Sequence, residues 1–447
     1  MKEQLPALSL LLTTGLLFPA PVAAQLISGG EIHSLAVCGD NAIMAWGYNS
    51  DGQLGNGTNT ISGVPVQVSS LTSVIATAAG FYHSFALVDD GTLWAWGDNG
   101  GGQLGIGTNT SSNVPVHVSS LVGVTAIAAG GRHSLALKND GTVWEWGDDV
   151  TLPAQVGALT GIIAIEAGDD HAIALKNDGT VWGWGDNLNG QLGDGTNTSS
   201  AVPVQAASLA GITAVAAGSE HSVALKNDGT VWAWGDNSDG QLGDGSTTST
   251  NVPVPVSALS GITAIAAGEP FSIALKSDGT VHAWGTNSYG ELGNGTNTAS
   301  TTSVQVMALT GITSIAVGDH HALSVKNDGT VWAWGNNGQG ELGNGTFTNS
   351  NVPVLVTGLC AVGVGVEEVT NGASVTVFPN PTSGNFTVRS DPDRADLTVL
   401  NSIGQVVYRA RTNGQAVEVD LNTQPNGLYL LTLASKGTII RHTVIKE

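Results

Sequence analysis

The most restrictive feature of this sequence is a motif that recurs seven times. In its clearest copy, Ile212 to Gly245, an apolar segment ending in Ala-Ala-Gly precedes His-Ser-Val-Ala-Leu-Lys-Asn-Asp-Gly-Thr-Val-Trp-Ala-Trp-Gly and then a Gly-Gln-Leu-Gly loop. The anchoring histidine recurs at spacings of 50, 50, 38, 50, 50 and 50 residues. These anchors are His33, His83, His133, His171, His221, Phe271 (in place of histidine) and His321. Such a period predicts an architecture in which each copy packs on its neighbours.

Each copy predicts four short strands. Ile262–Ala267 alternates apolar and small residues, and Ser222–Leu225 and Val231–Trp234 flank an Asn-Asp-Gly turn of the type that closes a hairpin. Val252–Val254 contains a proline, which is tolerated at a sheet edge because no ladder N–H is required there. No 3.6-residue periodicity of adequate length supports a helical solenoid. We therefore expect an all-β fold, a seven-bladed β-propeller.

The repeated block A-G-x-x-H-S-x-A-L-K-x-D-G-T-V-W-x-W-G-x-N-x-x-G-Q-L-G-x-G resembles the repeat of the regulator of chromosome condensation family. The resemblance covers Gln25 to Gly365 and implies the seven-bladed propeller of that family. Ring closure in such folds usually combines strands from both ends of the domain. Here Gln25–Gly30 and Ala361–Gly365 both remain candidates for the closing strand.

The first 24 residues have the pattern of a secretory signal peptide. Lys2 precedes an apolar run, Leu8–Phe18, and small residues follow at Val22–Ala24. We expect cleavage before Gln25, and we expect no transmembrane segment, because a membrane span needs about 20 apolar residues. Export places the chain in an oxidising compartment.

The two cysteines are predicted to form one disulfide. Cys38 ends the second strand of the first copy, and Cys360 follows the last strand of the seventh. The two ends of a closed ring are adjacent, so a Cys38–Cys360 bond would join them.

The repeat stops after Gly365 and a different pattern begins. A polar linker is followed by short predicted strands separated by turns, which suggests a small β-sandwich. These strands are Phe386–Val388, Leu397–Leu400, Val406–Tyr408, Val417–Val419, Tyr429–Leu433 and His442–Ile445. The combination F-P-N-P-x-x-G, N-x-x-G-Q-x-V and P-x-G-L-Y-L-L resembles the C-terminal sorting domain of the type IX secretion system. That resemblance implies recognition by the type IX machinery and a secreted or cell-surface protein.

Four segments are therefore expected along the chain. Residues 1–24 form the signal peptide and residues 25–366 the seven-bladed propeller. Residues 367–376 form the linker, and residues 377–447 form the C-terminal sorting domain.

Charge and motif spacing argue against several functions. The net charge of −22 disfavours nucleic acid and anionic lipid as partners. We expect no cofactor, no metal site and no catalytic residues. One histidine per blade cannot converge on zinc, so structural, hydrogen-bonded histidines are favoured. The loop Asp236–Asp244 lacks the glutamate of a calcium loop. All twelve tryptophans occupy the same two positions of the repeat, which favours packing between blades over a binding surface for sugars.

The loops before each histidine vary within this constant frame, as expected of a scaffold that carries a binding site. Counted from Gln25 to Val369, the chain has 29 acidic and 6 basic residues, and five of the basic ones are the repeated hairpin lysines Lys138, Lys176, Lys226, Lys276 and Lys326. The Gly-Gln-Leu-Gly loops are expected on the opposing rim, with a gap at the third blade, where this loop is deleted between Trp146 and Pro153. The ligand-binding candidates are Phe81, Tyr82, Arg132, Asp169, Asp170, Glu220, Glu269, Asp319 and His320.

The favoured function is that of a non-enzymatic binding protein that holds an unidentified protein or polysaccharide on these variable loops. Two alternatives remain open. One is guanine-nucleotide exchange on a small GTPase, by analogy with the nuclear member of the family, although export and acidity argue against it. The other is the binding or degradation of polysaccharide.

Overall fold

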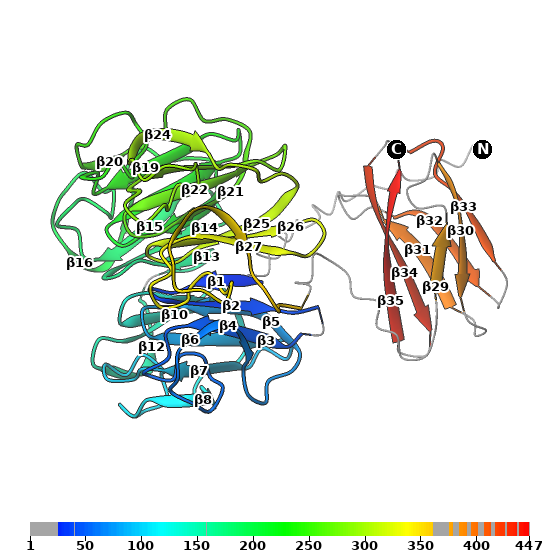
Figure 1. Ribbon diagram of the computed structural model, residues 1–447, viewed down its shortest axis with the longest axis horizontal. Coiled ribbons are helices and arrows are strands. Elements are labelled where there is room, and N and C mark those ends of the chain that lie inside the picture. The colour runs from blue at the N-terminus through cyan, green and yellow to red at the C-terminus, as the bar shows by residue number, and fades with distance from the viewer. Residues whose placement is uncertain are drawn as a thin grey trace, which may run out of the picture.

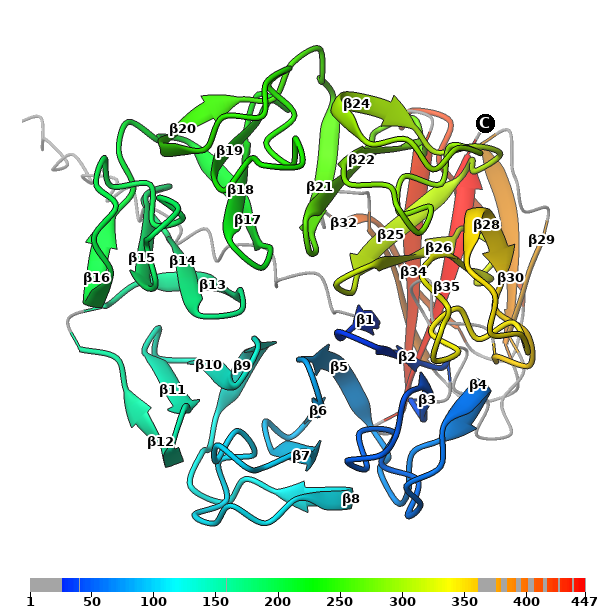
Figure 2. The same cartoon turned by 60° about the vertical axis from the view of Figure 1, so that its left-hand side comes forward.

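The structure is a computed structural model that describes residues 26–39, 41–157, 159–360, 375–378, 384–390, 395–400, 406–412, 416–424, 427–435 and 438–446. Seven four-stranded antiparallel sheets follow one another in chain order and form a closed ring (Figure 2). The predicted seven-bladed propeller is therefore confirmed. The described residues contain no helix long and apolar enough to cross a membrane.

Each blade consists of four consecutive strands, the first nearest the axis. Blade 1 contains β1 (Ile27–Gly29), β2 (His33–Val37), β3 (Ile43–Gly47) and β4 (Ser62–Gln67). Blade 2 contains β5 (Val74–Ala79), β6 (His83–Val88), β7 (Leu93–Gly97) and β8 (Ser112–His117). Blade 3 contains β9 (Val124–Ala129), β10 (His133–Lys138), β11 (Val143–Gly147) and β12 (Val150–Gln155). Blade 4 contains β13 (Ile162–Ala167), β14 (His171–Lys176), β15 (Val181–Gly185) and β16 (Ser200–Gln205). Blade 5 contains β17 (Ile212–Ala217), β18 (His221–Lys226), β19 (Val231–Gly235) and β20 (Thr250–Pro255). Blade 6 contains β21 (Ile262–Ala267), β22 (Phe271–Lys276), β23 (Val281–Gly285) and β24 (Ser300–Gln305). Blade 7 contains β25 (Ile312–Val317), β26 (His321–Lys326), β27 (Val331–Gly335) and β28 (Ser350–Leu355).

The ring closes without exchange of strands between its ends. Strand β1 lies inside the Gln25–Gly30 stretch, pairs with β2 of its own blade and contacts β25 and β26 of blade 7. The alternative segment, Ala361–Gly365, lies outside the described residues. Cys38 and Cys360 form a disulfide across the closing junction, with their Cα atoms 5.7 Å apart.

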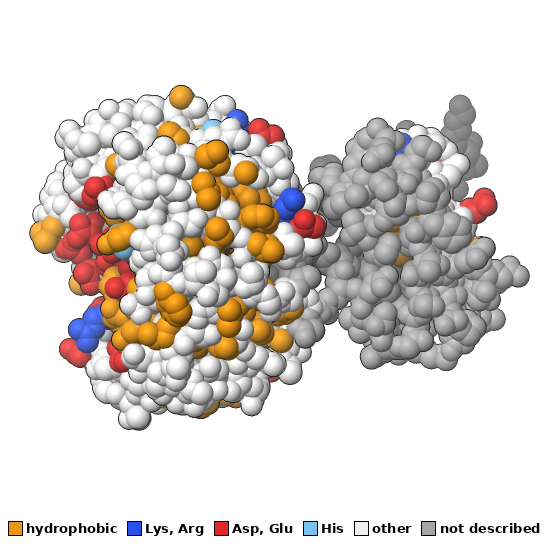
Figure 3. Space-filling view, in the orientation of Figure 1, with side chains coloured by type: hydrophobic (Ala, Val, Ile, Leu, Met, Phe, Trp, Pro, Cys, Tyr) orange, Lys and Arg blue, Asp and Glu red, His pale blue; other side chains and the backbone are white. Residues whose placement is uncertain are grey.

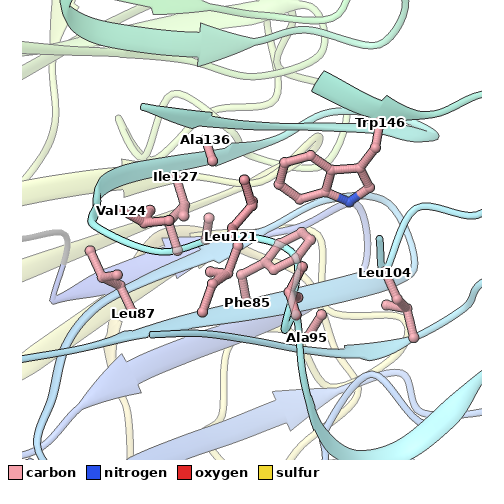
Figure 4. Close-up of a cluster of buried hydrophobic side chains, with 12 residues drawn as sticks. Phe85, Leu87, Ala95, Leu104, Leu121, Val124, Ile127, Ala136 and Trp146 are labelled. Atoms are coloured by element: carbon pink, nitrogen blue, oxygen red, sulfur yellow. The ribbon is translucent and has the colours of Figure 1, made fainter. Parts of the chain in front are cut away.

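Tryptophans fill the spaces between blades, as predicted. Trp146 of blade 3 is buried against Phe85 and Leu104 of blade 2 (Figure 4), and the Phe85 and Trp146 rings meet edge to face at 5.8 Å. Its indole N–H donates to the backbone carbonyl of Gln103, 2.8 Å away, in the Gly-Gln-Leu-Gly loop of blade 2. Gly105 of this loop has a φ of +69°, and a Cβ there would lie 2.7 Å from the indole nitrogen of Trp146. Glycine is therefore required where the loop passes over the tryptophan.

The repeated histidines are hydrogen-bonded structural residues at five junctions. His33 Nε2 lies 2.8 Å from Ser84 Oγ of the next blade, and Ser84 donates to the carbonyl of Gln53. Because that serine has only one proton, the imidazole must be the donor in the first bond. The same arrangement joins His83 to Ser134, His171 to Ser222, His221 to Ser272 and His321 to Ser34. Burial lowers the pKa of His33 to about 3, so its ring stays neutral.

Two junctions depart from this arrangement. Phe271 replaces the histidine of blade 6, and it packs in one cluster with Ala322, which replaces the serine of blade 7. Both members of the polar pair are therefore absent together. At the junction of blades 3 and 4, His133 is kept but faces Ala172, and its buried Nε2 has no hydrogen-bond partner among the described residues.

We expect Phe271→His to destabilise the propeller by about 3 kcal/mol, because the imidazole would be buried beside a methyl group without a partner. Adding Ala322→Ser supplies the hydroxyl, which can donate to the Glu291 carbonyl as its equivalents do in other blades. The double variant should recover about 1–2 kcal/mol of the loss. Urea unfolding of the four proteins of this double-mutant cycle measures the coupling. Effects that simply add would show that the two positions do not interact.

The C-terminal residues form a separate small sandwich (Figure 1). One sheet contains β29 (Val375–Phe378), β30 (Asn385–Ser390) and β33 (Val417–Asp420). The other contains β32 (Val406–Thr412), β31 (Ala395–Leu400), β34 (Gly427–Ser435) and β35 (Thr438–Lys446). Phe386 and Val419 of the first sheet pack on Leu397, Tyr429 and Val444 of the second.

The sandwich begins earlier than expected. Strand β29 starts at Val375, two residues inside the stretch assigned to the linker, and it pairs with β30 from Val375 to Phe378. The Val-Thr-Val alternation suits a strand, but four residues are too few for that pattern to stand out in the sequence. The rest of the linker, residues 367–374, and the signal peptide, residues 1–24, lie outside the described residues.

Candidate binding face

The propeller has two faces, which carry different loops. Strands alternate in direction, so the loops after the first and third strands of a blade leave the same edge of its sheet. We call this side the loop face. Backbone bonds join its two loop types: Asp98 N–H donates to the Tyr82 carbonyl at 2.8 Å, and Asn336 N–H to that of His320 at 2.8 Å. The expectation that the Gly-Gln-Leu-Gly loops lie on the opposing rim is therefore wrong.

The opposite side, the hairpin face, carries the turns between the second and third strands. Four of its repeated lysines lie near an aspartate of the same turn: Lys176, Lys226, Lys276 and Lys326 approach Asp178, Asp228, Asp278 and Asp328 at 3.5–3.8 Å. Each of these four lysines therefore has an aspartate beside it, whereas the blade 2 turn carries Asp89 and Asp90 without a lysine. Many other acidic residues of the propeller gather on the loop face, on the left in Figure 3.

Short inner loops surround the axis of the loop face and hold one another through the backbone. Glu31 N–H donates to the Gly80 carbonyl at 3.3 Å, and Glu269 N–H to that of Asp319 at 2.9 Å. A Cβ at Gly318 would lie 2.1 Å from the Gly30 carbonyl oxygen, so only glycine fits this close approach. The variable side chains that follow these glycines are thus carried by a tightly constrained ring.

Four carboxylates converge around this ring. They are Glu31, Asp169, Glu269 and Asp319, and Asp319 interacts electrostatically with the other three. Burial raises the pKa of Asp169 to about 7, and nearby carboxylates, Glu269 first among them, add to the shift. Burial and the same neighbours raise the pKa of Asp319 well above its usual range. Crowded, half-buried carboxylates of this kind favour a positively charged group placed among them.

Aromatic side chains and a histidine border the carboxylates. The Tyr82 hydroxyl bonds to Glu31, and burial together with this bond raises the pKa of Tyr82. Phe81 and Tyr48 each lie with their ring centroid 6.3 Å from that of Tyr82. Arg132 is exposed and lies beside the Gly101 backbone of the blade 2 loop.

His320 pairs with a buried carboxylate in the neighbouring blade. Its Nδ1 lies 3.4 Å from Oε1 of the fully buried Glu291, and its ring contacts Tyr289 at 5.2 Å. Burial alone would lower the pKa of His320, but the contact with Glu291 and the nearby carboxylates raise it.

The structure brings the predicted candidates onto one face but divides them into two sets. The first set lies on the inner loops: Asp169, Glu269 and Asp319 face one another at the centre, and Phe81 occupies the same inner-loop position in blade 2. The second set lies farther from the axis, against or beside the outer loops, which connect the third and fourth strands of a blade. It comprises Tyr82, Arg132, Asp170, Glu220 and His320. In this set, Glu220 accepts a 2.9 Å hydrogen bond from Asn189 of the preceding blade, and Asp170 is exposed.

Sequence reasoning missed Glu31, which belongs to this site, and Glu166, a half-buried carboxylate of the inner strands. Glu31 occupies in the first copy the position that Phe81 and Asp169 occupy in theirs, so alignment of the copies could have found it. Glu166 lies on β13, the innermost strand of blade 4, where most of the other copies have alanine. Burial raises its pKa to about 8.

Glu166→Gln should stabilise the propeller at alkaline pH. The folded-state pKa of Glu166, about 8, lies above the unfolded value of about 4.3. The wild-type protein therefore loses stability as pH rises from about 4 through 8, and the amide, which cannot ionise, removes that loss. We expect a gain on the order of 2 kcal/mol at pH 9, discounted for partial exposure, and little change at pH 4. Denaturant unfolding at both values measures it, with the exposed Asp170→Asn as control. Equal effects of Glu166→Gln at pH 4 and pH 9 would contradict this account.

The junction of blades 3 and 4 shows how the chain accommodates its deleted loop. No Gly-Gln-Leu-Gly carbonyl is present to accept the Trp184 indole N–H, and the carboxylate of Glu145 accepts it instead, at 2.9 Å. Ala172 fits the same explanation, because a serine there would lack the loop carbonyl to which its equivalents donate. The predicted gap at blade 3 therefore lies on the loop face.

Models of known families match most of the chain. The RCC1-like domain matches residues 149–378, and the regulator of chromosome condensation repeat matches residues 40–87 and 90–137. The secretion system C-terminal sorting domain matches residues 376–447. This last match supports secretion or display at the cell surface, as predicted.

Solved structures share the fold. Prp20p from Saccharomyces cerevisiae is 25% identical, with a TM-score of 0.64 over 70% of this chain and 85% of that chain. Human WBSCR16 is 22% identical, with a TM-score of 0.65 over 71% of this chain and 94% of its own. Ulvan lyase NLR42 from Nonlabens ulvanivorans is 30% identical over 73 residues, which are 16% of this chain. The chain covers only 14% of the length of that lyase.

Proposed function

The chain belongs to the family of RCC1-like domain proteins, and we propose that it is a non-catalytic binding protein that holds a cationic protein on its loop face. Its C-terminal sorting domain indicates that it acts outside the cell or at the cell surface. The yeast protein Prp20p has been studied for its binding to Gsp1p and histones, so protein binding has a precedent on this fold.

The observation that carries the proposal is the convergence of variable side chains on one constrained ring. Four carboxylates face the axis, and aromatic residues and Arg132 surround them, whereas the lysines are on the other face. A negative field of this kind speeds the encounter with cationic partners. Aromatic and arginine side chains are the residue types that most often supply the anchoring contacts of an interface.

A polysaccharide partner is the second candidate, favoured by the match to a stretch of ulvan lyase. That match is short and covers a small part of the lyase. An array of acidic and neutral glycans distinguishes the two candidates, because an acidic face should bind anionic glycans poorly.

The test compares variants of the two faces. The mature chain is immobilised, and proteins captured from the medium of co-cultured bacteria are quantified at low and high salt. Phe81→Ala/Tyr82→Ala/Arg132→Ala should weaken binding of each captured protein by about 2 kcal/mol or more. Lys138→Ala/Lys176→Ala/Lys226→Ala, a matched triple variant of the hairpin face, should bind normally. Glycan binding without protein capture, or loss of binding only in the lysine variant, would refute the proposal.

A further inference from the structure

At most junctions of the propeller, the outer loop of one blade covers the outer strand of the next blade. At six junctions, a glycine N–H of one outer loop donates to a carbonyl in the outer strand of the next blade, or at its start. These bonds are 2.8–2.9 Å long and join Gly57 to Asn113, Gly107 to Thr151, Gly195 to Asn251, Gly245 to Thr301, Gly295 to Asn351 and Gly345 to Gly63. Three of these junctions add a bond between asparagine side chains, such as that from Asn251 to Asn197 at 2.7 Å. Each covered outer strand therefore receives a peptide segment from its neighbour.

The seventh junction lacks this cover. Blade 3 turns directly from β11 to β12 through Asp148 and Asp149, and within the part of the chain that the structure describes no backbone bond joins a loop of blade 3 to β16 of blade 4. Ala201, at the position of the bonded acceptors, is exposed, and Val202 is 65% exposed. The equivalent Val64, Val114, Leu152, Val252 and Val352 are only 37–51% exposed. The outer strand is covered by a neighbouring loop at the other six junctions and is uncovered at this one.

The inner wall of this opening carries Asp170. Its equivalents at four junctions contact the outer loop of the preceding blade: Tyr82 meets Tyr48, Arg132 meets Gly101, Glu220 meets Asn189, and His320 meets Tyr289. The preceding loop is the one that blade 3 lacks. The structure gives the exposed carboxylate of Asp170 no hydrogen bond or ion pair within the described residues.

The inner end of the opening holds an unpaired polar group. At five other junctions a hydrogen-bonded chain runs from the histidine through serine to the loop carbonyl. Here the chain stops at His133, which is 4% exposed and whose Nε2 has no hydrogen-bond partner among the described residues. The opening, which we call the blade 3–4 notch, is thus bordered by Asp148, Asp149, Asp170, Ala201 and Val202.

We propose that the blade 3–4 notch binds an extended, basic segment of a partner protein, which takes the place of the missing loop. The Ala201 carbonyl accepts a backbone N–H, as its six equivalents do. Val202 contacts an apolar side chain, and Asp170 with the Asp148–Asp149 turn pairs with lysine or arginine. Backbone bonding at a strand edge supplies affinity, and side-chain contacts supply specificity. This inference rests on the proposed function only in taking the partner to be a cationic protein bound on the loop face.

A peptide built from the chain's own loop provides the probe. It has the sequence of residues 186–199, the outer loop of blade 4, with Asp186→Lys and Asp194→Lys, and carries a fluorophore for anisotropy measurements on the mature protein. The unmodified acidic peptide is its counterpart. We expect saturable binding of the basic peptide, weakened about five-fold or more by Asp170→Asn and by Val202→Lys, both exposed positions. Asp278→Asn, which removes an exposed carboxylate of the hairpin face, should leave binding unchanged.

A loop-filled variant closes the notch by replacing Asp148–Asp149 with residues 98–111 of blade 2, and it should not bind the peptide. Absence of saturable binding to the wild-type chain, or undiminished binding in the Asp170→Asn and Val202→Lys variants, would overturn the inference whether or not the loop-filled variant folds. Binding lost only in Phe81→Ala/Tyr82→Ala/Arg132→Ala would likewise overturn it, while leaving the proposed function standing.

Discussion

Replacing both cysteines by serine is expected to destabilise the propeller by several kcal/mol. Cys38 and Cys360 are 322 residues apart in sequence, and their bond joins blade 1 to the end of blade 7. The chain-entropy model gives on the order of 5 kcal/mol for a loop of this length. The closing junction is the only one of the seven without a peptide connection, so the disulfide supplies the covalent link that the other six already have.

The ring of the Cys38→Ser/Cys360→Ser variant should still close at low denaturant. The closing junction keeps the same non-covalent contacts as the others: Ser34 to His321 at 2.8 Å, and the Trp46 indole N–H to the Glu341 carbonyl at 2.7 Å. Urea unfolding of the wild-type protein, with and without reductant, and of the variant measures the difference. The reduced wild-type protein should have the same free energy of unfolding as the variant. Two titratable thiols in the exported, unreduced protein would disprove the bond itself.

Local patterns in the sequence predict the strands well, because each repeat contains its own turn residues and its own alternation of apolar and small side chains. The expected strand Ile262–Ala267 coincides with β21, and the expected edge segment Val252–Val254 lies within β20. The placement of the Gly-Gln-Leu-Gly loops failed for a different reason. The side on which a loop lies depends on the direction of the strand before it, and no local sequence motif indicates that direction.

Contacts between blades could not be predicted from one copy of the repeat. The other copies have alanine or glycine at the position of Glu145, but its role follows only from the position of Trp184, 39 residues later. In the same way, Ala322 is explained by Phe271 and Ala172 by the deleted loop. Each of these departures from the repeat compensates for a change at the junction with an adjacent blade. They can therefore be explained only from the assembled ring.

The same reasoning explains why the candidate site was found only in part. Aligning the variable loops identified Asp169, Glu269 and Asp319, since all three precede the anchor at the same position. It could not show that these carboxylates meet at the axis, or that Glu166 is half-buried on the innermost strand of blade 4. The raised pKa values of Asp169 and Asp319, caused first by burial, arise only in the closed ring.

Deleting Val375–Glu447 is expected to abolish delivery to the cell surface without unfolding the propeller. The C-terminal residues match a secretion system sorting domain, and the hydrophobic core of the sandwich consists of its own side chains. Among the described residues, no core cluster combines side chains of the sandwich with those of the blades, so we expect the blades to keep their packing without it. The truncation begins at β29, because a cut at Phe378 would leave most of that strand behind.

The truncated chain should accumulate in the periplasm as a folded, disulfide-bonded propeller. Cell fractionation and protease accessibility on intact cells measure its location, and far-ultraviolet circular dichroism together with urea unfolding reports its fold. Fusing residues 375–447 to an unrelated exported protein is the matched control, since this domain should carry the fusion to the surface. Normal surface delivery of the truncated chain would refute the assignment, whereas an unfolded truncated chain would show that the sandwich supports the propeller. Both domains would then have to be treated as one unit in every binding experiment proposed above.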